Sequence, residues 1–500
     1  MQLNEQELVR RQKLAELKSR GINPYPAEEY VITHTIHDIK NMYREEDSFV
    51  SVSIAGRLMN ITDMGKVNFA YIQDETDRIQ IYLKRDGDIC PTDDKTTYNI
   101  IWKRLIDIGD IIGIKGFVFT TKTGEITINV TEFTLLSKSL QPLPMQKEKD
   151  GEVYDEVNDV EFKYRNRHVD LIINPKCKET FVKITKMKTA MREYLNWLGA
   201  LEVDTPVLQS IPGGAAAKPF KTHHNALDIP LYMRIANELY LKRLIVGGFE
   251  KVYEFSRNFR NEGMDRTHNP EFTVMEFYAA YKDYIWMMNE TENMLSNVAL
   301  NVNGSTMTVV NGTTIDFAAP YQRISIYDSI LLNTGTDVSI MTNEQLLEFC
   351  RFSNINISPT AGKGKLIDAI FGEFCEHLYI QPTFITDYPI EMSPLAKKHR
   401  TKEGLVERFE LIVNGKELAN AYSELNDPID QRRRFEEQME LMGRGDDEAM
   451  FIDNDFINAL EYGMPPTAGI GIGVDRLAML LTGQSSIQDV LLFPQMRPKI

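Results

Sequence analysis

Cysteine is scarce in this chain of 500 residues, and its scarcity excludes several kinds of site. The four cysteines are Cys90, Cys177, Cys350 and Cys375, and no two of them form a C-x-x-C pair. A disulfide framework or a thiolate zinc site is therefore not expected. We predict four buried or chemically indifferent thiols in a reducing cytoplasm.

Long apolar runs are missing as well. No stretch reaches the roughly 18 uncharged apolar residues of a membrane helix, and the polar start Met-Gln-Leu-Asn-Glu-Gln-Glu-Leu lacks the apolar core of a signal peptide. With 43% hydrophobic and 26% charged residues, the composition is that of an ordinary globular chain. At roughly 150 residues per domain, we expect two or three domains, no membrane partner and a cytoplasmic location.

Two common nucleotide-binding patterns are also absent. Neither the P-loop nor the dinucleotide fingerprint G-x-G-x-x-G occurs, so any nucleotide must be bound by other means. The net charge of −16 argues against a sequence-blind nucleic-acid coat. Residues 51–140, however, carry eleven bases against twelve acids. A polyanion meets no strongly repulsive field there, but it needs specific contacts to stay bound.

The first 140 residues divide into a helical extension and a small barrel. A charged helix over 4–20, ended by Gly21, places an N-terminal helical extension at 1–49. Five short alternating runs within 50–140, with a helix-like stretch before the fourth, predict a Greek-key barrel of the OB type. The runs are Val50–Leu58, Asn68–Gln73, Arg78–Lys84, Asp110–Phe119 and Glu125–Phe133. Such barrels stack bases on aromatic rings and contact base edges. Phe69 and Gln80 are the candidates, although each also fits ordinary core or surface packing.

The remaining residues form a linker and one large region. Gln-Pro-Leu-Pro and a charged run indicate a linker over 141–165, and a large α+β region follows over 166–500. The stretch 336–380 is helical in character between strand-rich segments, which predicts an inserted helical subdomain. Near the start of the region, a helix over 181–198 precedes a short strand over 201–208. Pro206 predicts an edge position for that strand, where a partner chain could pair.

A strand–loop–strand segment over 252–279 carries the first cluster of polar side chains. Because strand side chains alternate between faces, the even positions of each strand share one face. That face of the sheet makes a poor hydrophobic core and suits a polar ligand with a flat ring, although a solvent-facing salt-bridged hairpin is the alternative. The residues on it are Asn258, Arg260, Glu262, Phe272, Glu276 and Tyr278.

A second hairpin, with Asn414-Gly415 at its turn, places two carboxylates on one face. With a two-residue turn, Ile412 faces Glu417, and Glu410 shares the face of Ile412. The two carboxylates are then roughly 7–8 Å apart, a span that a divalent cation and its waters can bridge. Two surface acids without a metal are the alternative. Asn420 and Glu424 have the opposite parity, so they reach the same site only if a bulge or bend intervenes.

A glycine-rich strand near the C-terminus completes the set of motifs. Gly469, Gly471 and Gly473 clear one face of a strand so that a ligand can lie against bare backbone. Arg476 begins the amphipathic helix that follows and points a fixed cation at the same region.

Together these segments resemble the three signature motifs of class II aminoacyl-tRNA synthetases. The order of barrel and catalytic region is similar to the subgroup of aspartyl, asparaginyl and lysyl enzymes, and several strings look like the lysyl family, such as Asn237-Glu-Leu-Tyr-Leu-Lys-Arg243 and Ser423-Glu-Leu-Asn-Asp-Pro428. The resemblance covers essentially the whole chain. Lys218 stands where an arginine is common in the family, and Asn237 where a proline is common; both replacements are mild.

The resemblance implies a fold, a reaction and a set of roles. The fold is α+β, with an OB barrel before a catalytic domain on an antiparallel sheet, and the reaction joins L-lysine to tRNA(Lys) with ATP and Mg²⁺ in a homodimer. Unpaired buried carboxylates would reject amino acids that lack the second ammonium group. The implied roles are catalysis by Arg260 and Arg476; ATP binding by Arg260, Glu262, His268, Phe272, Glu410, Gly473 and Arg476; lysine binding by Gly214, Glu238, Glu276, Tyr278, Asn420 and Glu424; Mg²⁺ binding by Glu410 and Glu417; and anticodon binding by Phe69 and Gln80.

Two rival functions remain at this point. The first is another amino-acid specificity within the subgroup. The paired acids of the side-chain pocket argue against aspartate, because their negative charges would repel its carboxylate. The second is an RNA-binding or regulatory protein without catalysis. Such a protein would not need Arg260, Glu410, Glu417 and Arg476 together.

Overall fold

The computed structural model describes residues 3–44, 50–86, 96–144, 147–149, 152–154, 159–215, 217–359, 361–443 and 451–498. The chain divides into two compact units, Met1–Asn158 and Asp159–Ile500. In the described part of the chain, no helix has the length and apolar character needed to cross a membrane. Cys177, Cys350 and Cys375 are buried free thiols as predicted, and Cys90 lies outside the described residues.

The first unit is a closed five-stranded barrel, as the alternating runs predicted. Its strands follow one another around the barrel in the order β1-β2-β3-β5-β4. Alternate residues such as Ile79, Ile81 and Leu83 fill the interior because successive side chains of a strand point to opposite faces. The elements are α1 (Glu5–Ser19), α2 (Ile36–Met42), β1 (Ser51–Asp63), β2 (Val67–Gln73), β3 (Arg78–Lys84), the π-helix η1 (Thr97–Leu105), β4 (Ile111–Thr120) and β5 (Ile126–Ser137).

Short elements lie between the barrel and the large region. Strands β6 (Lys147–Lys149) and β7 (Glu152–Tyr154) pair with each other in a two-stranded sheet. The predicted linker 141–165 also contains helix α3 (Val160–Arg165), which Asp159 caps by accepting hydrogen bonds from the backbone of Glu161 and Phe162. Helix α3 is therefore an ordered element at the start of the second unit, within the range predicted as a linker.

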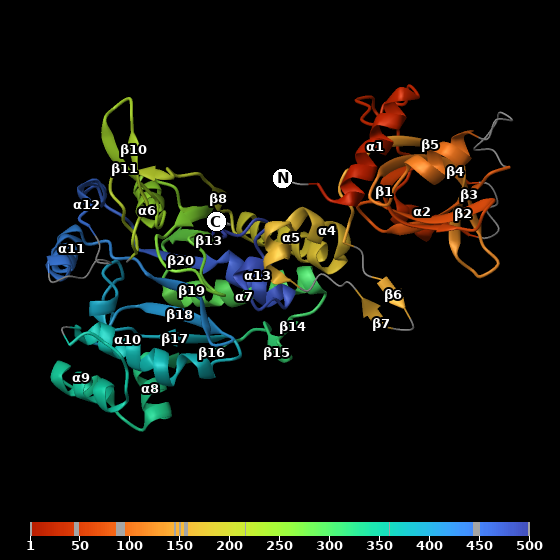
Figure 1. Cartoon of the computed structure of the whole chain (residues 1–500). Coiled ribbons are helices and arrows are strands. Elements are labelled where there is room, and N and C mark those ends of the chain that lie inside the picture. The colour runs from red at the N-terminus through yellow and green to blue at the C-terminus, as the bar shows by residue number, and fades with distance from the viewer. Residues whose placement is uncertain are drawn as a thin grey trace. The chain divides into compact units, whose positions relative to one another are not determined.

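The second unit is built on an eight-stranded, mostly antiparallel sheet (Figure 1). The strand order is β16-β17-β18-β19-β20-β13-β12-β8, so β8 lies at one edge, as the strand with Pro206 was predicted to do. Pro206 itself lies after β8 rather than in it. The strands are β8 (Leu201–Glu202), β12 (Lys251–Phe259), β13 (Glu271–Ala280), β16 (Gln322–Ser325), β17 (Thr383–Thr386), β18 (Arg408–Val413), β19 (Lys416–Ser423) and β20 (Thr467–Gly473).

The two faces of this sheet have different chemistry. Helices α5 (Pro175–Trp197), α7 (Tyr284–Asn303) and α13 (Val474–Thr482) pack on one face and bury the odd positions of β13, Met275 and Phe277, in the largest core. The even positions Glu276 and Tyr278 point to the other face, where the cavity described below lies. The helical face thus supports the sheet, and the opposite face is left to polar side chains.

A helical insertion interrupts the sheet between β16 and β17. Helices α8 (Ile326–Thr334), α9 (Asn343–Phe352) and α10 (Lys363–Phe374) lie beside these two strands (Figure 1). Their buried side chains form a separate hydrophobic cluster. β16 and β17 pair in parallel, so a crossover of this kind must connect them. The predicted insertion at 336–380 falls inside this segment, although α8 begins ten residues earlier.

The remaining elements surround the sheet. Helices α6, α11 and α12 form a further hydrophobic cluster with β12 and β13. The bounds are α4 (Arg167–Ile173), β9 (Leu208–Gln209), β10 (Lys221–His224), β11 (Ile229–Met233), α6 (Glu238–Val246), β14 (Met307–Val310), β15 (Thr313–Asp316), α11 (Pro428–Gly443) and α12 (Asn454–Glu461), with short 3₁₀ helices at Val338–Ile340, Glu376–Leu378, Ile390–Met392 and Ile487–Asp489.

Candidate active site

One cavity of about 1350 Å³ lies on the polar face of the sheet and contains every residue predicted for the catalytic region. The side chains come from β12, β13, β18, β19 and β20, from α6 and α13, and from the loops between them. The predicted residues among its lining are Gly214, Glu238, Arg260, Glu262, His268, Phe272, Glu276, Tyr278, Glu410, Glu417, Asn420, Glu424, Gly473 and Arg476.

The β12–β13 hairpin presents an arginine against an aromatic ring. Asn258 pairs with Phe272 in the ladder, which places Arg260 just beyond the strand end. The Arg260 guanidinium lies 5.1 Å from the centre of the Phe272 ring, and its Nε is buried without a hydrogen-bond partner among the described residues. A buried donor of this kind can take an acceptor that the described residues do not supply.

Three carboxylates gather at one end of the cavity. Glu238, Glu276 and Glu424 are all buried, and the Tyr278 hydroxyl donates to Glu276 Oε2 at 2.8 Å. Burial, and then the charge of Glu238, raises the pKa of Glu276 to about 8. Burial therefore favours the neutral form of this carboxyl, and a cation bound beside it would favour the charged form.

A lysine of the chain itself corrects one prediction. The sequence predicted carboxylates without partners, but the fully buried Lys242 forms ion pairs with both Glu238 and Glu424. Lys242 lies one helical turn after Glu238 on α6, so the pair follows from the i, i+4 geometry of the helix. Glu424 Oε1 still has no hydrogen-bond partner in the described structure, and the Tyr422 hydroxyl donates to Glu238 Oε1 at 2.6 Å.

A β-bulge resolves the parity problem on β19. The ladder pairs Leu411 with Ala419 but Ile412 with Glu417, so Leu418 is the extra residue. Glu410 then lies opposite Asn420, and Glu417 and Asn420 both line the cavity despite their opposite parity. The bulge required by the sequence interpretation is therefore present.

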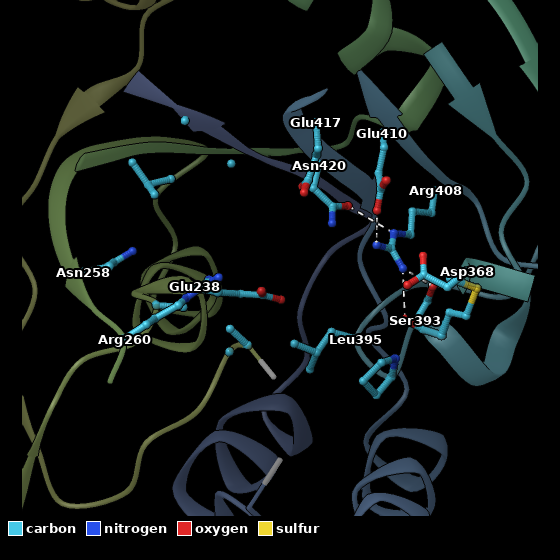
Figure 2. A pocket seen from close by; sticks show the side chains of 18 of the residues that line it. Glu238, Asn258, Arg260, Asp368, Ser393, Leu395, Arg408, Glu410, Glu417 and Asn420 are labelled. Carbon is cyan, nitrogen blue, oxygen red and sulfur yellow. Dashed lines mark hydrogen bonds and ion pairs between the residues drawn. The ribbon is translucent and has the colours of Figure 1, made fainter. Parts of the chain in front are cut away.

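The other end of the cavity holds Glu410 of β18 and Glu417 of β19, together with Arg408 of β18. Arg408 donates to Glu410 Oε1 at 2.6 Å and to Asn420 Oδ1 at 3.1 Å. Both contacts are drawn in Figure 2. Burial, and then the charge of Glu417, raises the pKa of Glu410. The described residues include no group of three or more His, Cys, Asp or Glu placed to hold a metal by themselves. These two carboxylates repel each other, so they fit a cation whose other ligands come from a substrate.

The glycines of β20 serve two different purposes. A Cβ on Gly469 would lie 2.1 Å from Glu424 Oε1 and 2.5 Å from the Tyr278 ring, so this glycine makes room for protein side chains rather than for a ligand. At Gly471 and Gly473 the nearest atoms to an added Cβ are 3.7 and 3.6 Å away. Gly471 and Gly473 thus leave room at the backbone, whereas protein side chains fill the space predicted for a ligand at Gly469.

Arg476 and His268 meet at the rim. Arg476 stands in the first turn of α13, donates to the backbone carbonyl of Glu417 at 2.6 Å, and has its Nη2 3.4 Å from His268 Nε2. Asp265 accepts from His268 Nδ1 at 2.8 Å and fixes the ring. The arrangement presents a cation and an imidazole on the same side of the cavity as Glu417.

Several lining residues were missed by the sequence analysis. Arg408 and Tyr422 share strand faces with Glu410 and Glu424, so alternation could have found them. The spacing of Lys242 from Glu238 indicated their ion pair but not the burial of Lys242. Asp368 comes from α10 in the insertion, and no sequence pattern connects it to the sheet.

The barrel carries its own candidate surface. The Phe69 and Tyr82 rings pair across β2 and β3 with centres 5.2 Å apart, and Tyr82 meets Phe119 at 5.9 Å. All three are partly exposed on the outer face, and Gln80 stands beside them on β3. A row of partly exposed rings next to an amide suits stacked bases with readable edges.

Comparison with known proteins first defines the class. The family described as "tRNA synthetases class II (D, K and N)" matches residues 159–497, and the "OB-fold nucleic acid binding domain" family matches residues 52–136. The chain therefore belongs to the class II tRNA synthetases of the D, K and N group, and the predicted fold class is confirmed.

Full-length relatives carry a more particular name. The protein named "Lysine--tRNA ligase" from Porphyromonas gingivalis (strain ATCC BAA-308 / W83) is 62% identical to this chain, over 100% of this chain and 86% of its own length. The protein of the same name from Azobacteroides pseudotrichonymphae genomovar. CFP2 is also 62% identical, over 99% of this chain and 99% of its own length. The protein of the same name from Christiangramia forsetii is 59% identical over 100% of this chain and 87% of its own length.

Proposed function

We propose that this chain is a cytoplasmic lysine–tRNA ligase. The lysine carboxylate attacks the α-phosphorus of ATP, pyrophosphate leaves, and a 3′-terminal ribose hydroxyl of tRNA(Lys) then takes the lysyl group while AMP leaves. The activity predicted from the sequence is confirmed by full-length relatives of that name. The roles of individual residues, the metal site and the dimer are proposals argued from the geometry.

Charge balance in the cavity carries the choice of lysine. When ionised, Glu238, Glu276 and Glu424 carry three negative charges, and the buried Lys242 offsets one of them. The remaining two match the two ammonium groups of free lysine. Glu238 and the Gly214 carbonyl suit the α-ammonium, whereas Glu276, Tyr278 and Glu424 suit the ε-ammonium. An amino acid without the second cation leaves a buried acid unpaired, which is strongly unfavourable.

The ATP side follows from the hairpin and α13. Phe272 stacks the adenine, Glu262 and His268 contact the nucleotide, and Gly473 leaves space beside it. Arg260 bridges the lysine carboxylate and the α-phosphate, which supplies the acceptor that its buried Nε lacks among the described residues. Arg476 faces the γ-phosphate. Catalysis is then mostly orientation and charge neutralisation, as is usual for attack at phosphorus.

Magnesium fits between the two carboxylates of the β18–β19 hairpin. Glu410 and Glu417 would hold Mg²⁺, which neutralises phosphate charge when bound. Arg408 orients both neighbouring side chains, because it donates one hydrogen bond to Glu410 Oε1 and another to Asn420 Oδ1.

Replacing Glu417 by Gln should weaken the response to magnesium. The amide removes one charge from the pair, so half-maximal ATP–pyrophosphate exchange will need more Mg²⁺, while tRNA binding stays nearly unchanged. The measurement is a magnesium titration of exchange beside a filter-binding assay for tRNA. A titration curve that overlays that of the unmodified protein would show that Glu417 is not a ligand.

Replacing Phe69 by Ala should damage tRNA recognition alone. Base–aromatic stacking is worth about 1–3 kcal/mol per base, so the tRNA KM for aminoacylation should rise roughly 5- to 150-fold. Amino-acid activation takes place in the other unit and should barely change. Both assays are run on one preparation, with Phe69→Tyr as the control that keeps the ring. Equal losses in both assays would indicate a folding defect, and no loss would remove Phe69 from the site.

The edge of the sheet supports a two-fold homodimer. Trp197 at the end of α5 is 76% exposed, and Leu201 on β8 is 49% exposed, so apolar side chains adjoin an edge strand that can pair. Sedimentation at micromolar concentration should give twice the chain mass of 57.4 kDa. A monomer mass would refute this assembly.

The decisive experiment is ATP–pyrophosphate exchange with each of the twenty amino acids, followed by aminoacylation of tRNA(Lys). Rapid exchange with lysine alone supports the proposal. Exchange with aspartate or asparagine in its place would assign another specificity of the same subgroup, and no exchange with any amino acid would favour a non-catalytic RNA-binding protein.

A further inference from the structure

Lys242 of α6 is a fully buried lysine behind the wall of the cavity. Glu238 and Glu424 line the cavity, whereas Lys242 does not. The single ammonium group of Lys242 forms ion pairs with both of these carboxylates. One nitrogen atom of the chain therefore joins the two acids that the proposed function gives to different ammonium groups of the substrate.

The surroundings of Lys242 keep its ammonium group charged. The ring centres of Tyr422 and Phe456 lie 5.5 and 5.7 Å from its Nζ, and aromatic faces attract a cation. Burial alone would lower the pKa of Lys242. The charges of Glu238 and Glu424 together outweigh burial and raise that pKa above its usual value. The protein thus holds a permanent cation at a place that solvent does not reach.

The carboxylate of Glu424 has one oxygen for this cation and one to spare. Its Oε2 pairs with Lys242, and its Oε1 has no hydrogen-bond partner among the described residues. The missing Cβ of Gly469 leaves room for that Oε1. On the other acid, the Tyr422 hydroxyl donates to Glu238 Oε1 at 2.6 Å, the same oxygen that pairs with Lys242. Without the lysine, two buried carboxylates would repel each other, and one of them would take up a proton.

We propose that Lys242 is a positioning residue that couples the α-ammonium and ε-ammonium sites of the lysine pocket. The inference rests on the proposed function, and it adds a link between two sites that each bind one ammonium group. Lys242 contacts no substrate itself. It acts by holding Glu238 and Glu424 ionised and at a fixed spacing before lysine binds, so the loss of one acid is felt at both sites.

The test is a double-mutant cycle between Lys242→Met and Glu424→Gln, read as the lysine KM in ATP–pyrophosphate exchange. Lys242→Met keeps the length of the side chain and removes its charge, so the lysine KM should rise at least about tenfold while the KM for ATP changes little. In that background Glu238 and Glu276 still match two ammonium groups. The rise caused by Glu424→Gln should therefore be at least about tenfold smaller than in the unmodified protein.

A neighbouring cation is the matched control. Arg243 follows Lys242 on α6 and packs with its guanidinium 5.2 Å from the centre of the Tyr240 ring, so Arg243→Met should leave the lysine KM unchanged. If Lys242→Met does not fold, the same cycle with Lys242→Gln decides the question, because that amide can still donate to a carboxylate without carrying a charge.

Three results would overturn the inference. They are an unchanged lysine KM in the Lys242 variant, an equal rise in the KM for ATP, and an effect of Glu424→Gln that is the same in both backgrounds, as a lysine that only fills space would give. If the unmodified protein supports no exchange with lysine, the proposed function fails instead.

Discussion

Replacing Glu424 by Gln should raise the lysine KM in ATP–pyrophosphate exchange by roughly 30- to 4000-fold. Truncating one partner of a buried charge pair typically costs 2–5 kcal/mol, and each 1.4 kcal/mol is tenfold. Glu424 is 2% exposed, so water cannot solvate the lysine ammonium in place of the lost carboxylate. The ion pair between Glu424 and Lys242 is lost too. The buried Lys242 then has only Glu238 as an ion-pair partner.

The same assays show whether the effect belongs to the lysine pocket. The KM for ATP should change little, because the nucleotide lies on the hairpin side of the cavity. Glu348→Gln removes a carboxylate from an exposed position of α9 and should behave like the unmodified protein. If the KM for ATP rises as much as that for lysine, Glu424 supports the whole site rather than the ε-ammonium.

Replacing Arg260 by Gln should lower kcat for adenylate formation by roughly 100- to 1000-fold. That is the usual loss when one preorganised donor is removed from a developing negative charge. Arg260 packs against the Phe272 ring, which helps to position its guanidinium before substrates arrive, and its buried Nε has no partner among the described residues, so it can donate to a substrate. Arg260→Lys keeps the charge but loses the planar fork, so its kcat should lie between those of Arg260→Gln and the unmodified protein.

Single-turnover formation of lysyl-adenylate is the measurement, because it isolates the chemical step. Arg257→Gln is the matched control, since Arg257 lies on β12 three residues before Arg260, with 47% of its side chain exposed and a loose 3.8 Å contact to Glu271. Comparable losses in the two variants would assign the effect to the strand rather than to the guanidinium of Arg260.

Periodicity was sufficient to predict the barrel because each of its strands has one buried face. The alternation in Arg78–Lys84 predicted a barrel strand with the bounds that the structure shows. The first run was predicted over 50–58, but β1 extends to Asp63, since pairing with β2 continues past the last alternating residue. Propensity cannot reveal an extension that a neighbouring strand supports.

The candidate site was predictable where its residues lie on strands next to one another in the chain. Glu410 and Glu417 follow from the turn at Asn414-Gly415 alone. Asp368 enters the cavity from the insertion, because the crossover between β16 and β17 brings α10 back over the sheet. Lys242 was missed for another reason: a lysine on a helix is normally solvated, and its burial depends on Glu424 from a distant strand.

The bulge at Leu418 also determines where the length of this chain can vary. Removing one residue at 418–419 converts the bulge into a regular ladder, and Asn420 then stands two places after Glu417, still on the cavity face. Removing Ala421 instead turns Tyr422 and Glu424 away from the cavity. We therefore expect homologous chains to differ by a one-residue gap at the bulge, and to show no single-residue gap between Asn420 and Glu424.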